Sequence, residues 1–254
     1  MSIESSPPAY LQVARQIREA IAAGEFPRGA KLPAEPELAH RYGVSRALVN
    51  RALGILQSEG LVRPQRGRGT FVNEIPVIRR NTAGRQQRTV RESGEARGAF
   101  EAELKANGLV PATTVTIARM SAPTQVAALL DIPEGTEVLS RSRVMTANDV
   151  PVQVATSYLP LDIAEGTALE QKDTGPGGSY SRLADLGHAP AEFTELVRVR
   201  APEAEEAQAL KMELEQRVFT ITRTARTASG RIVEVNVITL PAHQWELSFT
   251  WPAE

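Results

Sequence analysis

The sequence predicts an α+β protein with a small helical N-terminal domain and a larger C-terminal domain built on an antiparallel sheet. Two observations carry this prediction. Helical stripes of apolar residues over the first 60 residues are followed by two short strands around a glycine-rich turn. From about residue 99, alternating segments are joined by short turns, which is typical of hairpins. At 254 residues the chain is long enough for two cores.

The N-terminal domain, residues 1–76, begins with two helices. A stripe of Tyr10, Val13, Ile17 and Ile21 indicates the first helix, which Gly24 ends. Leu32–Ala39 indicates a short second helix with proline near its start, where a missing N–H is tolerated. Only residues 41–44 separate it from the next helical pattern, and this spacing is typical of a helix-turn-helix.

The third helix has one apolar and one polar face. It begins after Ser45, whose hydroxyl can cap the first turn, and Gly60 ends it. A helix that enters the major groove of DNA needs long donors near its N-terminus and small residues beside them. The alternative to such a recognition helix is an ordinary amphipathic helix on the protein surface. The polar face carries Arg46, Ala47, Asn50 and Gly54, with Arg51 at its border.

A basic hairpin follows this helix. Leu61–Gln65 and Thr70–Asn73 indicate strands around Arg66, Gly67, Arg68 and Gly69. The glycines let the turn lie close to a nucleic-acid backbone, and the arginines can meet phosphates or enter the minor groove. This hairpin is a candidate wing; a solvated hairpin without a partner is the alternative.

These segments together resemble the GntR-type winged-helix transcription regulators over about residues 7–75. The matching segments are Lys31–Glu35, Glu37–Ala39, Gly43–Arg46, Ala52–Leu53, Glu59–Leu61 and Gly67–Val72. The resemblance implies contacts between double-stranded DNA and both the helix and the wing. Two positions depart from the family pattern: Pro36 stands where many members have an arginine or glutamine, and Asn50 where many have a second recognition arginine. An asparagine favours adenine over guanine. The candidate DNA-binding residues are Glu35, Ser45, Arg46, Ala47, Asn50, Arg51, Arg66, Gly67, Arg68, Gly69 and Thr70.

Charge is distributed unevenly in a chain whose net charge is only −1. Residues 1–91 contain 15 Lys or Arg against 7 Asp or Glu, and the remainder contains 14 against 23. A basic N-terminal part suits a polyanion. The absence of cysteine excludes disulfides and thiol chemistry, and no apolar span reaches the roughly 18 residues of a membrane helix. We therefore expect a cytoplasmic protein with no membrane partner.

Residues 77–98 are expected to form a mobile basic linker, because the segment is rich in Arg, Gly and polar residues. Its arginines can add phosphate contacts or be simply solvated.

The C-terminal domain follows over residues 99–254. Its expected strands are Thr113–Met120, Glu137–Thr146, Val150–Leu159, Phe193–Arg200, Val218–Ala228 and Arg231–Leu240, and its expected helices are Thr124–Leu130, Ser179–Leu186 and Pro202–Met212.

This domain is similar to the UTRA effector-sensing domain of the HutC subgroup of GntR regulators, whose fold is related to chorismate lyase. The similarity rests on Val138–Leu139, Arg141, Arg143, Pro151–Val152, Ser157–Pro160, Tyr180, Leu183, Gly187, Gly230 and Val233–Glu234. It implies a small-molecule effector and a homodimer held by this domain. By the resemblance, Arg141 and Arg143 bind an acidic effector, with Tyr158, Tyr180 and Glu234 close to it.

Strand alternation leads to some of the same residues. Leu139, Arg141, Arg143 and Met145 share one strand face, so two cations lie among apolar neighbours. Such a pair suits an anion, or else lies on an exposed face or in salt bridges. Glu234 and Asn236 interrupt an apolar row, which favours a ligand or a buried hydrogen-bond network.

The segment Thr174–Tyr180 precedes a helix, so its amides, with Ser179, can hold an anion or form a plain loop. It is not a P-loop. A phosphosugar effector is in doubt, because Gly178 stands where such relatives often have serine and no Tyr-Arg pair occurs near Leu240–Pro241.

The three histidines lack metal-ligand spacing and no catalytic motif occurs, so we expect no metal, cofactor or enzyme activity. The predicted function is an effector-modulated regulator, more plausibly a repressor; the alternative is an effector-blind DNA-binding protein.

Overall fold

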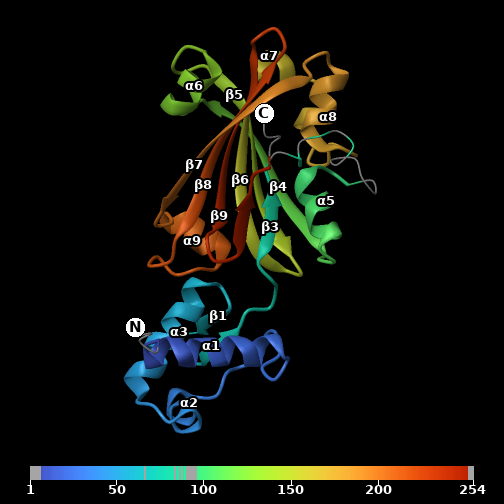
Figure 1. Ribbon diagram of the computed structural model, residues 1–254. Helices are drawn as coiled ribbons and strands as arrows, with labels where there is room; N and C mark the ends of the chain where they lie inside the picture. The colour runs from blue at the N-terminus through green and yellow to red at the C-terminus, as the bar shows by residue number, and fades with distance from the viewer. Residues whose placement is uncertain are drawn as a thin grey trace, which may run out of the picture. The chain divides into compact units, whose positions relative to one another are not determined.

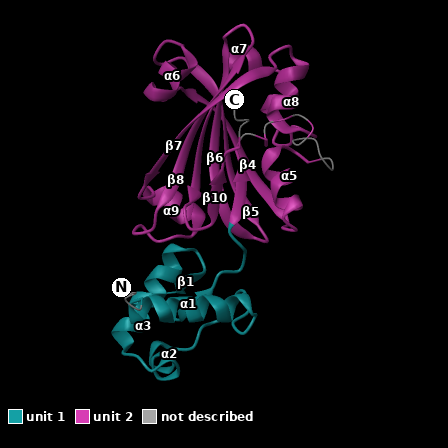
Figure 2. Cartoon of the chain, in the orientation of Figure 1, with its two compact units in different colours: residues 1–77 teal, residues 78–254 magenta. Residues whose placement is uncertain are grey.

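The chain forms two compact units, residues 1–77 and 78–254 (Figure 2). The computed structural model describes residues 7–65, 67–82, 84, 85, 87, 89 and 96–250. Arg66 of the predicted wing and residues 83, 86, 88 and 90–95 of the predicted linker lie outside the described residues.

Unit 1 consists of three helices and a two-stranded hairpin. The elements are α1 (Ala9–Ala22), α2 (Glu35–Tyr42), α3 (Arg46–Ser58), β1 (Val62–Gln65) and β2 (Gly69–Val72), and all five are labelled or coloured in Figure 1. The hairpin is antiparallel, with Val62 opposite Val72 and Gln65 opposite Gly69. The buried apolar residues of all three helices and both strands form one core, which includes Ile17, Leu38, Val49, Leu56, Val62 and Val72.

Local sequence signals fix the turn between α2 and α3. Gly43 ends α2 in the left-handed conformation with φ 65°, which a side chain would strain. Ser45 follows in extended conformation, and its hydroxyl oxygen accepts a hydrogen bond from the Leu48 N–H at 3.4 Å. At the other helix, the Glu37 side chain accepts a bond from the Ala34 N–H at 2.8 Å. The start of α3 is therefore defined by its cap.

Unit 2 is built on a six-stranded antiparallel sheet with the order β4-β5-β6-β9-β8-β7. Hairpins join β5 to β6 and β8 to β9, as the sequence predicts. The antiparallel α+β class is thus confirmed. The bounds are β4 (Pro111–Ser121), β5 (Glu137–Ala147), β6 (Val150–Pro160), β7 (Pro190–Arg200), β8 (Val218–Thr227) and β9 (Ile232–Pro241).

Helices lie on both faces of the sheet (Figure 1). On one face, α6 packs against Tyr158 and Val235, and the α9 residue Glu206 accepts a bond from Thr239 at 2.7 Å. On the other face, α8 contributes Tyr180 and Leu183 to an apolar cluster with α7. The helices are α5 (Ala99–Ala106), α6 (Thr124–Leu130), α7 (Leu161–Ala164), the 3₁₀ helix η2 (Ala168–Glu170), α8 (Gly178–Asp185) and α9 (Ala204–Leu210).

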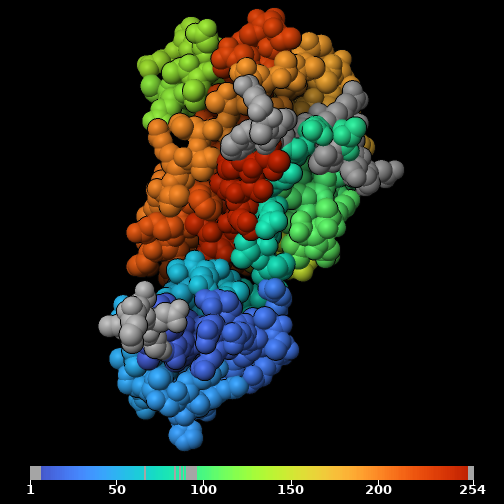
Figure 3. Space-filling view, in the orientation of Figure 1, coloured from blue at the N-terminus to red at the C-terminus, as the bar shows by residue number. Residues whose placement is uncertain are grey.

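The predicted linker begins with a strand. Here β3 (Ile78–Asn81) pairs in parallel with β10 (Trp245–Ser248), which joins the start of unit 2 to its end. In Figure 3 this teal segment runs along the surface of unit 2 beside the red atoms of β10. The Arg80 side chain is fully buried, whereas Arg79 on the opposite face is exposed. The expectation of a solvated linker is therefore wrong for Ile78–Asn81, because the strand buries every second residue.

The sequence patterns predicted the location of all six strands of the main sheet and of α6, α8 and α9. They did not predict β3, β10, α5, α7 or η2. Four of them, β3, β10, α7 and η2, have only three or four residues, too few for an apolar pattern that distinguishes them from loops. The parallel pairing of β3 also depends on a partner that lies far away in the sequence.

The two hairpin turns predict opposite effects of matched substitutions. Asp149 has φ 63° and Gly230 has φ 89°, both in the left-handed region. Asp149→Gly should raise the free energy of unfolding by about 0.5 kcal/mol, because glycine relieves backbone strain. Gly230→Ala should lower it by about 1 kcal/mol through backbone strain alone, since no atom lies within 4 Å of its Cβ position. Urea unfolding of the full chain measures both changes; equal shifts would contradict the turn assignment.

Candidate functional site

The polar face of α3 is exposed at its N-terminal end. Ser45, Arg46, Ala47 and Asn50 are all exposed, and the small Ala47 lies next to Arg46. The opposite face is buried through Val49, Ala52, Leu53 and Leu56. The helix therefore presents a long guanidinium donor beside a short side chain, an arrangement that suits close approach to base edges.

The structure gives several of the candidate DNA-binding residues partners within unit 1. The Asn50 amide donates a hydrogen bond to the Glu35 carboxylate at 3.2 Å, which links α3 to the start of α2. The Arg51 guanidinium lies 3.8 Å from the centre of the Tyr10 ring, a cation–π contact with α1. Arg51 is thus partly engaged by its own domain. Ser45 is engaged as the cap of α3.

The wing contacts the segment that leads into α2. Leu32 N–H donates to the Thr70 carbonyl at 2.8 Å, and Lys31 forms a bridge with Phe71. Gly67 and Gly69 have φ of 72° and 108°, so the turn uses the conformational freedom predicted for it. The Arg68 guanidinium lies 5.7 Å from the Phe71 ring centre. The wing and the start of α3 are therefore connected through the segment 31–35.

The exposed arginines of unit 1 differ in whether a carboxylate lies beside them. Arg18 pairs with Glu59, Arg41 with Glu25 and Arg63 with Glu74. No carboxylate among the described residues pairs with Arg46 or Arg68. The start of α3 and the wing therefore each present an exposed cation that a polyanion can bind.

Unit 2 contains a cavity of about 630 Å³ on the α5 and α8 side of the sheet. This volume fits a small molecule. Strands β5 and β9 contribute alternate residues, as expected for one strand face. The lining residues on which the argument rests are Arg85, Arg97, Arg141, Arg143, Gln153, Ser179, Tyr180, Arg223, Glu234 and Asn236.

The two arginines predicted as an anion-binding pair have different surroundings. Arg141 donates to the backbone carbonyls of Leu169, of Gln171 at 2.6 Å and of Lys172 at 3.3 Å. Burial, with the nearby Arg143 charge, lowers the pKa of Arg141 to about 10. Arg143 donates to Ser157 and, at 3.3 Å, to Asn236, and burial lowers its pKa also. Arg141 therefore anchors a loop, and Arg143 bonds only neutral acceptors.

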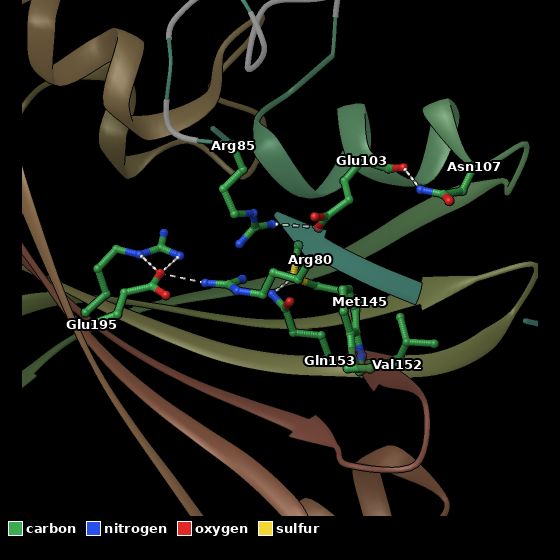
Figure 4. Close-up of polar contacts among 10 residues, drawn as sticks. Arg80, Arg85, Glu103, Asn107, Met145, Val152, Gln153 and Glu195 are labelled. Atoms are coloured by element: carbon green, nitrogen blue, oxygen red, sulfur yellow. Dashed lines mark hydrogen bonds and ion pairs between the residues drawn. The ribbon is translucent and has the colours of Figure 1, made fainter. Parts of the chain in front are cut away.

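A buried network continues from this pair across the sheet. The Tyr180 hydroxyl donates to Glu234, and burial raises the pKa of Tyr180, which keeps the phenol protonated. Arg223 donates to Glu195 at 2.7 Å from the adjacent strand. Arg80 of β3 reaches the same carboxylate at 2.6 Å, as Figure 4 shows. Glu195 thus joins β3 to the cavity wall.

Positive charge exceeds negative charge in this buried region. The described residues of the cavity lining and the network include seven cations, Arg80, Arg85, Arg97, Arg141, Arg143, Lys172 and Arg223, against five carboxylates, Glu101, Glu103, Asp173, Glu195 and Glu234. Two of the arginines, Arg141 and Arg143, bond neutral acceptors rather than a carboxylate. Burying unpaired charge is costly, so the region suits an anion.

Comparison with known proteins agrees with both parts of the structure. Residues 9–72 match the model of the bacterial regulatory proteins of the gntR family, and residues 106–245 match the UTRA domain. The chain belongs to the GntR family. Its UTRA domain places it in the HutC subgroup, a family of transcription regulators rather than enzymes.

Relatives align over nearly the whole chain. An uncharacterized HTH-type transcriptional regulator of Streptomyces coelicolor is 32% identical over 96% of this chain and 94% of its own length. The histidine utilization repressor of Pseudomonas putida is 31% identical, covering 90% and 85%. A crystal structure of a GntR-family transcriptional regulator has a TM-score of 0.60 at 28% identity, covering 98% and 99%.

The UTRA domain brings together six of the seven predicted effector residues. Arg141, Arg143, Ser179, Tyr180, Glu234 and Asn236 all line the cavity. Tyr158 does not, and its assignment needs correction. Its register partners are Ser140 and Val235, on the opposite face of the sheet, where it packs against the α6 cluster. Strand alternation excludes it from the face that carries Arg141.

The sequence prediction missed Arg85, Arg97, Gln153, Arg223 and Glu195. Arg223 carries the same signal that identified Arg141, an arginine between two inward apolar residues, here Ile221 and Ala225. No cluster of three or more His, Asp or Glu that could hold a metal occurs in the described part of the chain. Across the same residues, no helix has the length and apolar character to cross a membrane.

The contacts of Arg141 predict a specific effect on one loop. Arg141→Met removes three donors from the carbonyls of residues 169–172 while keeping the apolar part of the side chain. Amide exchange in this loop should accelerate by about tenfold, the equivalent of one lost hydrogen bond. Hydrogen-exchange mass spectrometry measures the change. Arg143→Met, the matched control, should leave the loop unchanged; unchanged exchange in Arg141→Met would show that other contacts hold it.

Proposed function

We propose that this GntR regulator is a sequence-specific repressor that binds a two-fold operator as a homodimer and responds to a small anion in the UTRA cavity. The observation that carries the proposal is the pairing pattern of its arginines. In unit 1, Arg46 at the start of α3 and Arg68 in the wing are exposed and have no carboxylate partner among the described residues, so duplex DNA can reach them. In unit 2 the excess cations are buried around a cavity.

DNA recognition divides between the helix and the wing. Arg46 and Asn50, on the exposed face of α3, read base edges, while Ala47 lets the backbone approach. Asn50 already donates to Glu35, so the pair presents one polar group rather than two independent ones. Arg68 and the amides of Gly67, Gly69 and Thr70 contact phosphates or the minor groove. Arg66, by its place in the wing, adds a further cation.

Two features support repression and effector control. The related proteins of Pseudomonas putida and Bacillus subtilis are named as repressors. The cavity with its excess of positive charge favours a sensor over the effector-blind alternative, which has no need of a polar cavity. A regulator of this kind meets its operator in the cytoplasm. An effector that favours a different spacing of the two recognition helices lowers operator affinity.

The experiment that tests the proposal is selection of bound duplexes from a random DNA pool, repeated with a library of small anions. Enrichment of one two-fold motif, lost when an anion is present, supports the proposal. Enrichment that no anion changes supports the effector-blind alternative. No enrichment at all contradicts sequence-specific binding.

Arg46→Ala should weaken binding to the selected operator by about 1–3 kcal/mol and relax the preference at one base position. The reason is the loss of a guanidinium that can bond a base edge bidentately. Fluorescence anisotropy on the operator and on its single-base variants measures both effects. Arg15→Ala, which removes an exposed arginine of α1 near Glu19, is the matched control and should bind normally. Unchanged specificity in Arg46→Ala would place the recognition surface elsewhere.

Arg68→Ala should weaken binding to every sequence to a similar extent. It should also reduce the slope of log affinity against log salt by about one, because one phosphate contact is lost. Salt titrations of operator and random duplexes measure the slope. Arg18→Ala, whose guanidinium is paired with Glu59, should keep the wild-type slope; an identical slope in Arg68→Ala would remove this residue from the phosphate contacts.

The operator complex should contain two chains on one duplex, because one winged helix covers only half of a two-fold site. Sedimentation of the full chain with a fluorescent operator measures the stoichiometry. A half-site duplex, the control, should bind much more weakly. One chain per full-length operator would contradict the dimer.

A further inference from the structure

The segment that follows the DNA-binding unit forms part of the cavity wall. Arg85, Arg97 and Gly98 line the cavity, although all three lie in the stretch expected to be a solvated linker. The segment is fastened at its start by the pairing of β3 with β10. It is fastened again where Gly177 N–H donates to the Ala96 carbonyl at 2.8 Å. A cavity ligand therefore touches the connecting segment itself.

Arg85 is the buried cation of this segment. Its side chain is 5% exposed and lies 3.1 Å from the Glu103 carboxylate of α5, as Figure 4 shows. Glu103 also accepts a hydrogen bond from the Asn81 backbone, so it holds the segment at two points. Burial lowers the pKa of Arg85 and raises that of Glu103, so the ion pair is disfavoured by its own desolvation. The Arg85 Nε is buried without a hydrogen-bond partner among the described residues.

Arg85 and Arg143 line the same cavity. Arg223 lines it with them, and its positive charge lowers the pKa of each. The Arg143 Nε is also buried without a partner among the described residues, and its bonds go to neutral acceptors. Two guanidiniums with unused donors are suited to a carboxylate or phosphate, whose oxygens accept several charge-assisted bonds.

We propose that Arg85, together with Arg143, binds the oxyanion of the effector, and that Arg85 thereby transmits occupancy of the cavity to the segment leading to the DNA-binding unit. The inference rests on the proposed function and names the chemistry of its site: a carboxylate or phosphate group. The anion competes with Glu103 for the Arg85 guanidinium. Binding therefore weakens the tie between α5 and the segment that begins at β3.

Three substitutions in the full chain test the proposal, with inorganic phosphate and succinate as probes against chloride at constant ionic strength. Arg85→Gln should weaken binding of the bound probe by about ten to a hundredfold, the loss of a charge-assisted hydrogen bond. Glu103→Gln should tighten it several-fold, because the competitor for Arg85 is removed. Arg79→Gln, on the exposed face of β3, is the matched control and should bind as wild type. Titration calorimetry and thermal unfolding measure the affinities.

Opposite signs for Arg85→Gln and Glu103→Gln support the proposal, because general loosening of the fold would weaken binding in both. Wild-type affinity in Arg85→Gln overturns it, as does a wild-type protein that binds neither probe. If Arg85→Gln fails to fold, Glu103→Gln decides the matter: unchanged or weaker binding overturns the proposal.

A second readout separates this inference from the proposed function. Affinity for the selected operator is measured with and without the bound probe. If the probe lowers operator affinity equally in wild type, Arg79→Gln and Arg85→Gln, effector control is supported and the role of Arg85 is overturned. If no duplex is selected at all, the proposed function fails, while the probe affinities still decide whether Arg85 binds the anion.

Discussion

The position of the connecting segment depends on one buried carboxylate. Glu195 of β7 receives hydrogen bonds from Arg223 on the neighbouring strand and from Arg80 on β3. Removing Glu195 would leave both guanidiniums without this carboxylate in the interior, and an uncompensated buried charge typically costs about 3–5 kcal/mol. The bond from Arg80 to Glu195 therefore attaches β3 to the sheet, in addition to its pairing with β10. Because β3 is fixed, Asn81 and Arg85 come to lie beside Glu103, and the start of unit 2 becomes part of the cavity.

The two units use arginine in contrasting ways. In unit 1 the cations without partners are exposed, so salt screens them and each contributes little until many phosphates neutralise them together. In unit 2, Arg141 and Arg143 bond neutral acceptors inside the domain, where desolvation lowers their pKa and a single anion gains a large electrostatic advantage. The first arrangement suits a long polyanion and the second a small one. A chain with a net charge close to zero can therefore have separate sites for a long polyanion and for a small anion.

The sequence predicted regular features well and long-range pairings poorly. Alternation along β5 and β9 placed Arg141, Arg143, Glu234 and Asn236 on one face, and that placement is confirmed by the cavity they line. The same rule, applied to Tyr158, would have put it on the other face. The partners of Arg141 are backbone carbonyls about 30 residues away, and no sequence pattern reveals them. In β3 the buried residues include an arginine, so the strand resembles a solvated charge run until its carboxylate partner is known.

Reciprocity limits what such a site can do. If the anion lowers operator affinity, the operator must lower anion affinity by the same factor. The exchange of Glu103 for an oxyanion at Arg85 changes about one charge-assisted hydrogen bond, so the coupling of one cavity is about 1.5–3 kcal/mol at most. In a dimer, two cavities act on one operator complex, and their contributions add if both segments move. The proposed dimer therefore doubles the free energy that one arginine can transmit, and it makes release from DNA depend steeply on the concentration of the anion.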